Sequence, residues 1–116
     1  MSNAANIRID GNALVLLSSG LRVGFLWPID KVLEFENAYI VRISPEPGSC
    51  FNENVFGVAL DGKLLWQIEA RKHVYADSCY TEILKSDDKA KLFNWDGDEL
   101  IVEPLTGKIL NVRYSK

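Results

Sequence analysis

Short apolar segments separated by Asp-Gly and Thr-Gly pairs are the feature that most constrains the fold. Three pairs share the pattern DGxxL, at residues 10–14, 61–65 and 96–100, and a fourth begins TGKIL at residues 106–110. Asp-Gly tolerates the positive φ angles that tight hairpin turns require, and each pair leads directly into an apolar segment. The pattern predicts successive antiparallel hairpins rather than crossover connections.

The segments between these turns have the length and composition of strands. They are rich in Val, Ile, Leu and aromatic residues, and several alternate polar and apolar side chains. At residues 40–44, Ile40, Arg42 and Ser44 alternate with Val41 and Ile43, so we expect one face of this strand to be buried and the other to face solvent. The best place for a helical turn is ADSCYTEILK, residues 76–85. We expect an all-β fold, an antiparallel meander of about nine to eleven short strands that form a sandwich or open barrel with propeller-blade-like hairpins.

Two of the hairpins repeat at the spacing of propeller blades. Residues 62–65 (GKLL) and 107–110 (GKIL) align at a separation of about 45 residues, but a closed ring needs at least about four blades. A chain of 116 residues is too short for that and suits one domain over residues 1–116. The irregular stretch at residues 69–78 separates the aligned halves and is a natural place for binding.

Composition excludes several classes of partner. The net charge of −3 and the scattered basic residues disfavour nucleic acid, because phosphate binding needs clustered Lys and Arg. The longest apolar stretch, VGFLWPI, is too short for a membrane helix, and the amino terminus lacks an export signal. Cys50 and Cys79 have neither zinc-site spacing nor the density of a disulfide framework. We therefore expect a cytoplasmic protein with reduced thiols and no membrane partner.

The acidic turn DGDE at residues 96–99 invites a comparison with calcium loops. Its carboxylates are hard oxygen ligands, but the glycine falls at the second position, and the EF-type loop needs a glycine at the sixth. We expect a hairpin turn with solvated acids, and neither a metal nor a cofactor.

Signatures of catalysis are also missing. The only histidine, His73, follows two basic residues and has no partner at catalytic spacing, so we expect it on the surface. A pair between His73 and Cys79 stays open, although neither flank matches a protease motif. We expect that the protein is not an enzyme.

Charge gathers in one part of the chain. Residues 77–103 contain eight acids and three bases, a net charge of −5 that exceeds the net charge of the whole chain. Acidic groups around aromatic anchors suit a cationic protein partner, and the alternative is the solvated edge of a sheet. Trp27 and Trp66 have aliphatic neighbours and are expected in the core, whereas Trp95 is expected to be partly exposed. The candidate partner-binding residues are Asp77, Tyr80, Glu82, Asp87, Asp88, Trp95, Asp96, Asp98 and Glu99.

Three segments resemble a family of small bacterial β-rich proteins: WPIDKVLEFENAYIVRISPEP, NVFGVALDGKLLWQIE and KLFNWDGDELIVEPLTGKIL. In its size and acidity the chain also resembles immunity proteins of contact-dependent growth inhibition and related polymorphic toxin systems. That resemblance implies that the protein binds a cognate toxin domain, a basic nuclease, and occludes its active site. Where the family carries an aromatic or basic strand after NWDG, this chain has DELIVEP, which adds charge.

A second hypothesis comes from a different class of function. A non-catalytic β scaffold or regulatory module would bind a small molecule or another protein, and a pocket for it would be lined by Trp27 or Trp66. Nothing in the sequence indicates the oligomeric state.

Overall fold

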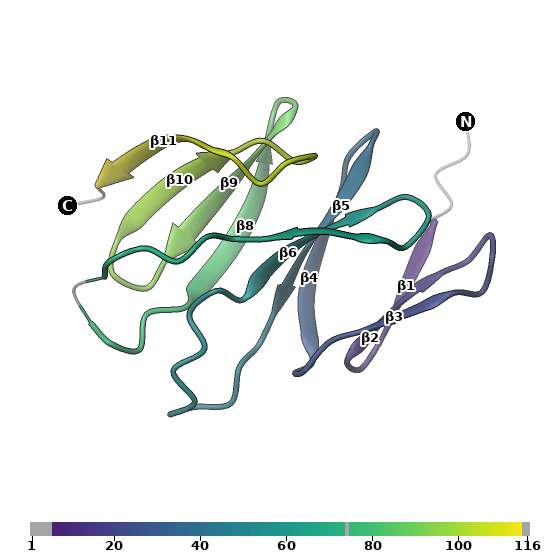
Figure 1. Ribbon diagram of the computed structural model, residues 1–116, viewed down its shortest axis with the longest axis horizontal. Coiled ribbons are helices and arrows are strands. Elements are labelled where there is room, and N and C mark those ends of the chain that lie inside the picture. Colours follow the sequence, from purple (N-terminus) through teal and green to yellow (C-terminus); the bar gives the residue numbers. More distant parts are fainter. Residues whose placement is uncertain (1–5, 74, 115–116) are drawn as a thin grey trace.

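The chain folds into three antiparallel sheets, and the middle one lies between the other two (Figure 1). This computed structural model describes residues 6–73 and 75–114. Within those ranges it contains eleven strands and no helix, which confirms the expected all-β meander. Each sheet keeps two free edges, so the strands do not close into a barrel. The strands are β1 (Ile7–Asp10), β2 (Ala13–Leu16) and β3 (Arg22–Gly24) in the first sheet; β4 (Ile29–Glu34), β5 (Ala38–Ile43), β6 (Val55–Ala59) and β7 (Leu64–Gln67) in the second; and β8 (Tyr80–Ser86), β9 (Lys89–Asn94), β10 (Asp98–Val102) and β11 (Ile109–Tyr114) in the third.

The glycine turns lie where the sequence places them. Gly62 (φ 97°) lies between β6 and β7, and Gly107 (φ 76°) lies between β10 and β11. These are equivalent positions, because each turn is the third connection of a four-stranded sheet. The repeat of about 45 residues therefore reports two sheets of the same topology.

The middle sheet is buried on both faces. One of its faces packs against the first sheet through a cluster that includes Tyr39 and Val41, and the other packs against the third sheet through a cluster that includes Ile40. The expectation that one face of β5 is exposed to solvent is wrong, because the third sheet covers the face of Ile40 and the first sheet covers the face of Val41. The Arg42 side chain is 13% exposed and donates a hydrogen bond to the carbonyl oxygen of Tyr80.

Trp66 connects the second sheet to the third. Its indole Nε1 donates a hydrogen bond of 2.7 Å to the carbonyl oxygen of Pro104, which lies between β10 and β11. The ring lies against Gly57 and Gly107, where an added Cβ would come within 2.1 Å and 2.5 Å of ring atoms. Trp66 is buried, as expected, and Trp27 is partly buried against Phe51.

The expected helical turn at residues 76–85 is wrong. Residues 76–79 belong to a loop, and the apolar residues that follow form β8, which pairs with β9 along its length. The pairing with a neighbouring strand outweighs the weak local helical signal. No helix of the described residues is long and apolar enough to cross a membrane.

Candidate functional site

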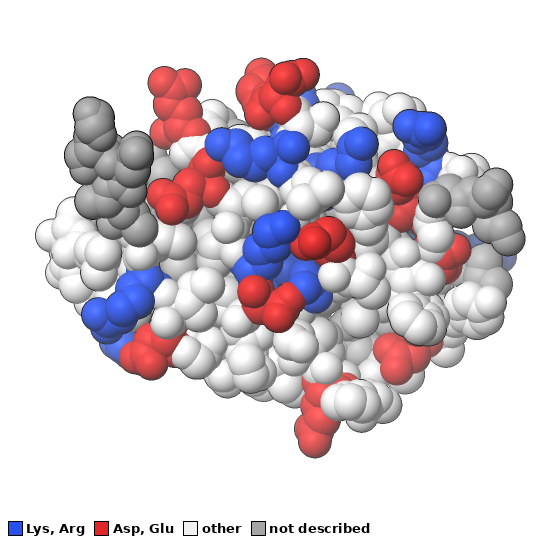
Figure 2. All heavy atoms as spheres, turned by 180° about the vertical axis from the view of Figure 1, so that it is seen from behind, with Lys and Arg blue, Asp and Glu red and all other residues white. Residues whose placement is uncertain are grey.

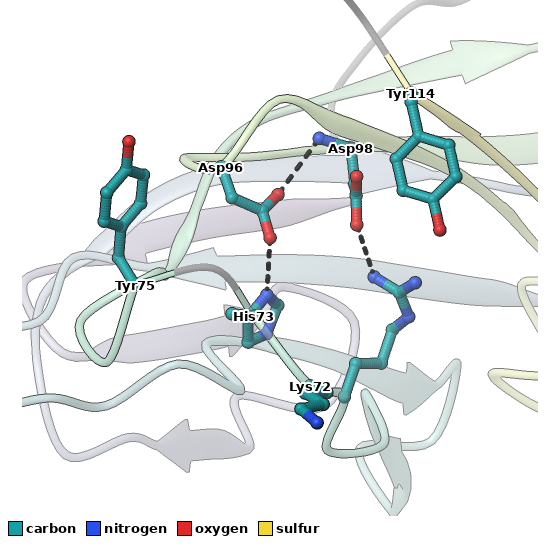
Figure 3. Close-up of a pocket in the computed structure, with 7 residues that line it drawn as sticks. Lys72, His73, Tyr75, Asp96, Asp98 and Tyr114 are labelled. Atoms are coloured by element: carbon teal, nitrogen blue, oxygen red, sulfur yellow. Dashed lines mark hydrogen bonds and ion pairs between the residues drawn. The ribbon is translucent and has the colours of Figure 1, made fainter.

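A pocket lies at one end of the third sheet, between the loop that precedes β8 and the turn between β9 and β10. Its cavity volume is about 720 Å³. Figure 3 shows the tyrosines on two sides of a group of charged side chains. The lining residues are Arg71, Lys72, His73, Tyr75, Asp96, Asp98 and Tyr114.

Three asparagine side chains fix the loop at residues 69–79 that forms one wall. Asn52 donates to the carbonyl oxygen of Ala76 and accepts from the amide of Ser78. Asn54, which is fully buried, accepts from the amide of Tyr80 and donates to its carbonyl oxygen. Asn94 donates to the carbonyl oxygen of Ser78. The described residues of this loop form no helix or strand, so these amides supply partners that its backbone needs.

The β9–β10 turn aims two carboxylates at this loop. The amide of Gly97, whose φ is 100°, donates 3.0 Å to the carbonyl oxygen of Asn94 and closes the turn. The carboxylate of Asp96 accepts from the amide of Asp98, also at 3.0 Å. Asp98 is the first residue of β10 and shares its inward face with Leu100 and Val102.

Both carboxylates form close ion pairs with the loop. Nδ1 of His73 lies 2.9 Å from Oδ2 of Asp96, and the two side chains are 4% and 2% exposed. Nη1 of Arg71 donates 2.9 Å to Oδ2 of Asp98, and these side chains are 18% and 9% exposed. Hydrogen-bonded ion pairs with so little exposure hold their members in fixed positions, so the floor of the pocket is preformed.

The surroundings of Asp96 favour its charged form. Burial on its own raises the pKa of this carboxyl, but the hydrogen bonds from His73 and from the Asp98 amide, with the nearby charges of His73 and Arg71, lower it below its ordinary value. Burial on its own lowers the pKa of Arg71, but the hydrogen bond with Asp98, together with the charges of Tyr80, Asp98 and Asp96, outweighs this effect, so that the pKa is raised. The Asp96 carboxylate and the Arg71 guanidinium are therefore both in their charged forms at neutral pH.

The lowered pKa predicts how the protein responds to acid. The folded pKa of Asp96 lies below the unfolded value of about 3.9, so the stability that this carboxylate contributes is complete above that pH and is lost as the pH falls through the folded pKa. The urea midpoint of the native protein should fall between pH 5 and pH 2 more steeply than that of Asp96→Asn. Asp10→Asn, which removes an exposed carboxylate, is the control. If the urea midpoints of Asp96→Asn and of the native protein fell equally steeply with pH, the lowered pKa of Asp96 would be contradicted.

The hydroxyl of Tyr80 lies buried beside this floor. It has no hydrogen-bond partner among the described residues, and the side chain is 1% exposed. Burial raises its pKa to about 12, while Arg71 lowers the pKa and Asp96 raises it. Arg71 acts on the phenol at short range, although no hydrogen bond of ordinary geometry joins the two side chains.

Removal of this hydroxyl should cost no stability. A buried hydroxyl without a partner carries a desolvation penalty, so Tyr80→Phe should be neutral or stabilising by up to about 1 kcal/mol. Because the folded pKa of about 12 lies above the unfolded 10.0, ionisation should remove native stability as the pH rises from 10 through 12, and Tyr80→Phe should resist that loss. Urea titrations at pH 7 and pH 11 measure both effects. A loss of more than about 1 kcal/mol at pH 7 would indicate a missing partner for the hydroxyl.

Three sequence expectations about the site are corrected. The acids of the DGDE turn are not solvated, because Asp96 and Asp98 face the loop instead of water. His73 is not a surface residue, since its side chain is almost fully buried against Asp96. Tyr80 is buried and has no surface with which to contact a partner directly.

The remaining candidate partner-binding residues are dispersed. Trp95 is 65% exposed, as expected, and lies in the same turn as Asp96. Glu82 pairs with Lys31 of the second sheet. Asp87 and Asp88 occupy the turn between β8 and β9, at the opposite end of the sheet and about 20 Å away for strands of this length. Asp77, exposed, precedes β8, and Glu99, half-buried, lies on β10.

The acids thus form no single surface. Several are already matched by basic neighbours, and on the face shown in Figure 2 basic and acidic side chains are intermixed. The net charge of the segment does not translate into one acidic patch on that face.

Five lining residues were absent from the sequence-based site: Arg71, Lys72, His73, Tyr75 and Tyr114. One sequence signal could have pointed to them. Side chains alternate between the two faces of a strand, so Asp98 lies on the same face of β10 as Leu100 and Val102. A carboxylate on a buried face needs a basic partner. Which base supplies it depends on the tertiary contact between the loop and the turn.

Comparisons with known proteins identify the family and the fold. No curated protein matches the chain. A crystal structure of the computationally designed Ika8 protein resembles it with a TM-score of 0.66 and 16% sequence identity. That likeness covers 99% of this chain and 36% of the designed chain, so this chain spans about a third of that protein's length, and it shows the fold alone. A family model described as "Domain of unknown function (DUF7957)" matches residues 4–114, and the chain belongs to this family.

Proposed function

We propose that the protein is a non-catalytic binding module whose binding centre is the pocket between the 69–79 loop and the β9–β10 turn. The main support for this proposal is the preformed floor of the pocket. Two buried side-chain pairs, Arg71–Asp98 and His73–Asp96, hold polar groups in place beneath two exposed tyrosines. Sites for small ligands combine a concave shape with a few fixed polar groups, in cavities of roughly 300–1,000 Å³. The pocket meets both conditions, although its walls contain neither Trp27 nor Trp66.

The surroundings of Cys79 and His73, the pair that the sequence left as an open alternative, support a role without catalysis. Burial raises the pKa of the Cys79 thiol, and the charge of Asp77 raises it further, so the reactive thiolate is disfavoured at neutral pH. His73 has its Nδ1 committed to Asp96 and its side chain is 4% exposed. Neither group has the accessible, activated character of a catalytic residue.

A thermal-shift screen tests this proposal. The probes are small polar compounds in three sets: neutral sugars, carboxylic acids and amines, each at about 10 mM. Binding to the native fold raises the Tm by mass action. At least one probe should raise the Tm of the native protein and should not raise that of a variant with Tyr75→Ala and Tyr114→Ala. Leu26→Ala is the control, because Leu26 is an exposed apolar residue that lies just after β3 of the first sheet. A shift that survives in the double variant would place the site elsewhere.

Neutralisation of a toxin domain is the second candidate function. The observation that favours it is the exposed Trp95, because tryptophan and tyrosine are enriched at the centres of protein interfaces. Asp77 and Glu99 have no ion-pair partner among the described residues, so both are available to a basic surface. In this role the pocket end, with Trp95 beside it, would cover the active site of a cationic nuclease.

Co-expression tests the second candidate. Growth of cells that express the toxin domain encoded beside this chain should be restored by the native protein, and a variant with Trp95→Ala and Glu99→Lys should restore it less well. Asp88→Lys, at the opposite end of the third sheet, is the matched charge control and should rescue fully. Failure of the native protein to rescue growth or to co-purify with the toxin would contradict this function.

A further inference from the structure

We propose that the pocket binds a neutral saccharide. The proposal rests on the proposed function of the same pocket and adds the chemical class of its ligand. It depends on three properties of the lining: the balance of charge, the hydrogen-bonding groups that the ion pairs leave free, and the two exposed tyrosines.

The lining favours neither anions nor cations. Two carboxylates, Asp96 and Asp98, and two bases, Arg71 and Lys72, line the pocket, so it carries no net charge before any proton on His73 is counted. An anion would have to approach two carboxylates, and a cation would have to approach a guanidinium and an ammonium. Lys72 is exposed and has no ion-pair partner among the described residues, but an anion that reached it would also be repelled by the two carboxylates, and a cation would be repelled by the two bases. A neutral polar ligand avoids this repulsion.

The ion pairs leave donors and acceptors next to each other. Asp98 uses Oδ2 to bind Arg71, and its other carboxylate oxygen has no partner among the described residues. Arg71 uses Nη1, and a guanidinium has five N–H donors in all. A hydroxyl both donates and accepts, so two neighbouring hydroxyls of a sugar can bind a carboxylate oxygen and a guanidinium N–H side by side. Carboxylic acids and amines at neutral pH supply one kind of group only.

The tyrosines provide surfaces for the apolar faces of a sugar ring. Tyr75 is 57% exposed and Tyr114 is 73% exposed, and in Figure 3 they lie on either side of Asp96 and Asp98. Aromatic rings with a polar tip suit ligands that are apolar on one face and polar at the edge. The cavity of about 720 Å³ accepts a monosaccharide or a disaccharide.

Titration with three sugars that share one ring scaffold tests the proposal. Glucose is neutral, glucuronate is an anion and glucosamine is a cation, so the comparison isolates charge; galactose, mannose, N-acetylglucosamine and maltose extend the neutral set. Binding is followed by tyrosine and tryptophan fluorescence and by calorimetry. At least one neutral sugar should bind with a Kd on the order of 1 mM or lower, and more tightly than glucuronate and glucosamine. Tyr114→Ala, at an exposed site, should weaken it about tenfold, and Leu26→Ala should not.

Each other outcome counts against the proposal. Tightest binding of glucuronate or of glucosamine would assign the pocket to anions or to cations. Sugar binding that is unchanged by Tyr114→Ala would place the saccharide elsewhere. If no neutral sugar binds but an acid or amine of the thermal-shift screen does, the saccharide proposal fails while the binding function stands. If no probe binds, both fail.

Discussion

Substitution of Gly57 by alanine should destabilise the protein by about 3 kcal/mol, because the new methyl group has no space. An added Cβ would lie 2.1 Å from Nε1 of Trp66, far inside van der Waals contact. The indole cannot shift freely, since Nε1 donates to Pro104 and the other side of the ring lies against Gly107. The strain must therefore break the hydrogen bond between the second and third sheets or displace β6. Urea unfolding followed by tryptophan fluorescence measures the loss.

Gly24→Ala is the matched control for this substitution. Gly24 also lies in a strand, but no atom lies within 4 Å of the position its Cβ would take, and its φ is not in the left-handed region. Its replacement should change stability by less than about 1 kcal/mol. Equal midpoints for the two variants would mean that Trp66 is not confined between the glycines.

Substitution of Asn54 by alanine should have an effect of similar size, again about 3 kcal/mol, for a different reason. Its fully buried amide group accepts from the amide of Tyr80 at 2.8 Å and donates to the carbonyl oxygens of Ile43 and Tyr80, at 2.9 Å and 3.0 Å. Alanine leaves these backbone groups without that partner in a place that water does not reach. The loss should appear in the urea midpoint measured by circular dichroism.

Asn12→Ala separates the effect of burial from the loss of an amide. Asn12 is exposed and makes a hydrogen bond of 3.3 Å to the carbonyl oxygen of Leu26. Water can replace this bond, so its removal should cost less than about 0.5 kcal/mol. If Asn54→Ala were no more destabilising than Asn12→Ala, the asparagine would not be holding β8 and the loop to the middle sheet.

Most of the fold could be predicted from the sequence because its signals are local. The Asp-Gly and Thr-Gly pairs fix turns through the φ preference of glycine, and these turns connect β1 to β2, β6 to β7, β9 to β10 and β10 to β11. The repeat of about 45 residues indicated two similar hairpins, and the structure shows that each closes a four-stranded sheet. What local pattern could not show is how the sheets stack. Residues 40 and 42 alternate like an exposed face, yet the third sheet covers them, because stacking depends on contacts between segments far apart in the chain.

The candidate site was harder to predict for the same reason. The sequence pointed to the 69–78 stretch as a place for binding and to the DGDE turn as unusual, and the structure brings the two together. The sequence did not indicate that the two acids of the turn face bases of the loop. Asp96 faces His73, which is 23 residues away in the chain, and Asp98 faces Arg71, which is 27 residues away. Charge counted along a segment treats these carboxylates as free, whereas the fold has already paired them.

The position of ligand contact tests the central claim, that the pocket is the binding centre. Amide resonances of the 15N-labelled protein can be followed while each neutral sugar, carboxylic acid and amine of the thermal-shift screen is added to about 10 mM. The changes should be confined to the loop at residues 71–75, the turn at residues 96–98 and Tyr114. Changes centred instead on the first sheet, or no change with any of the three sets, would contradict the account.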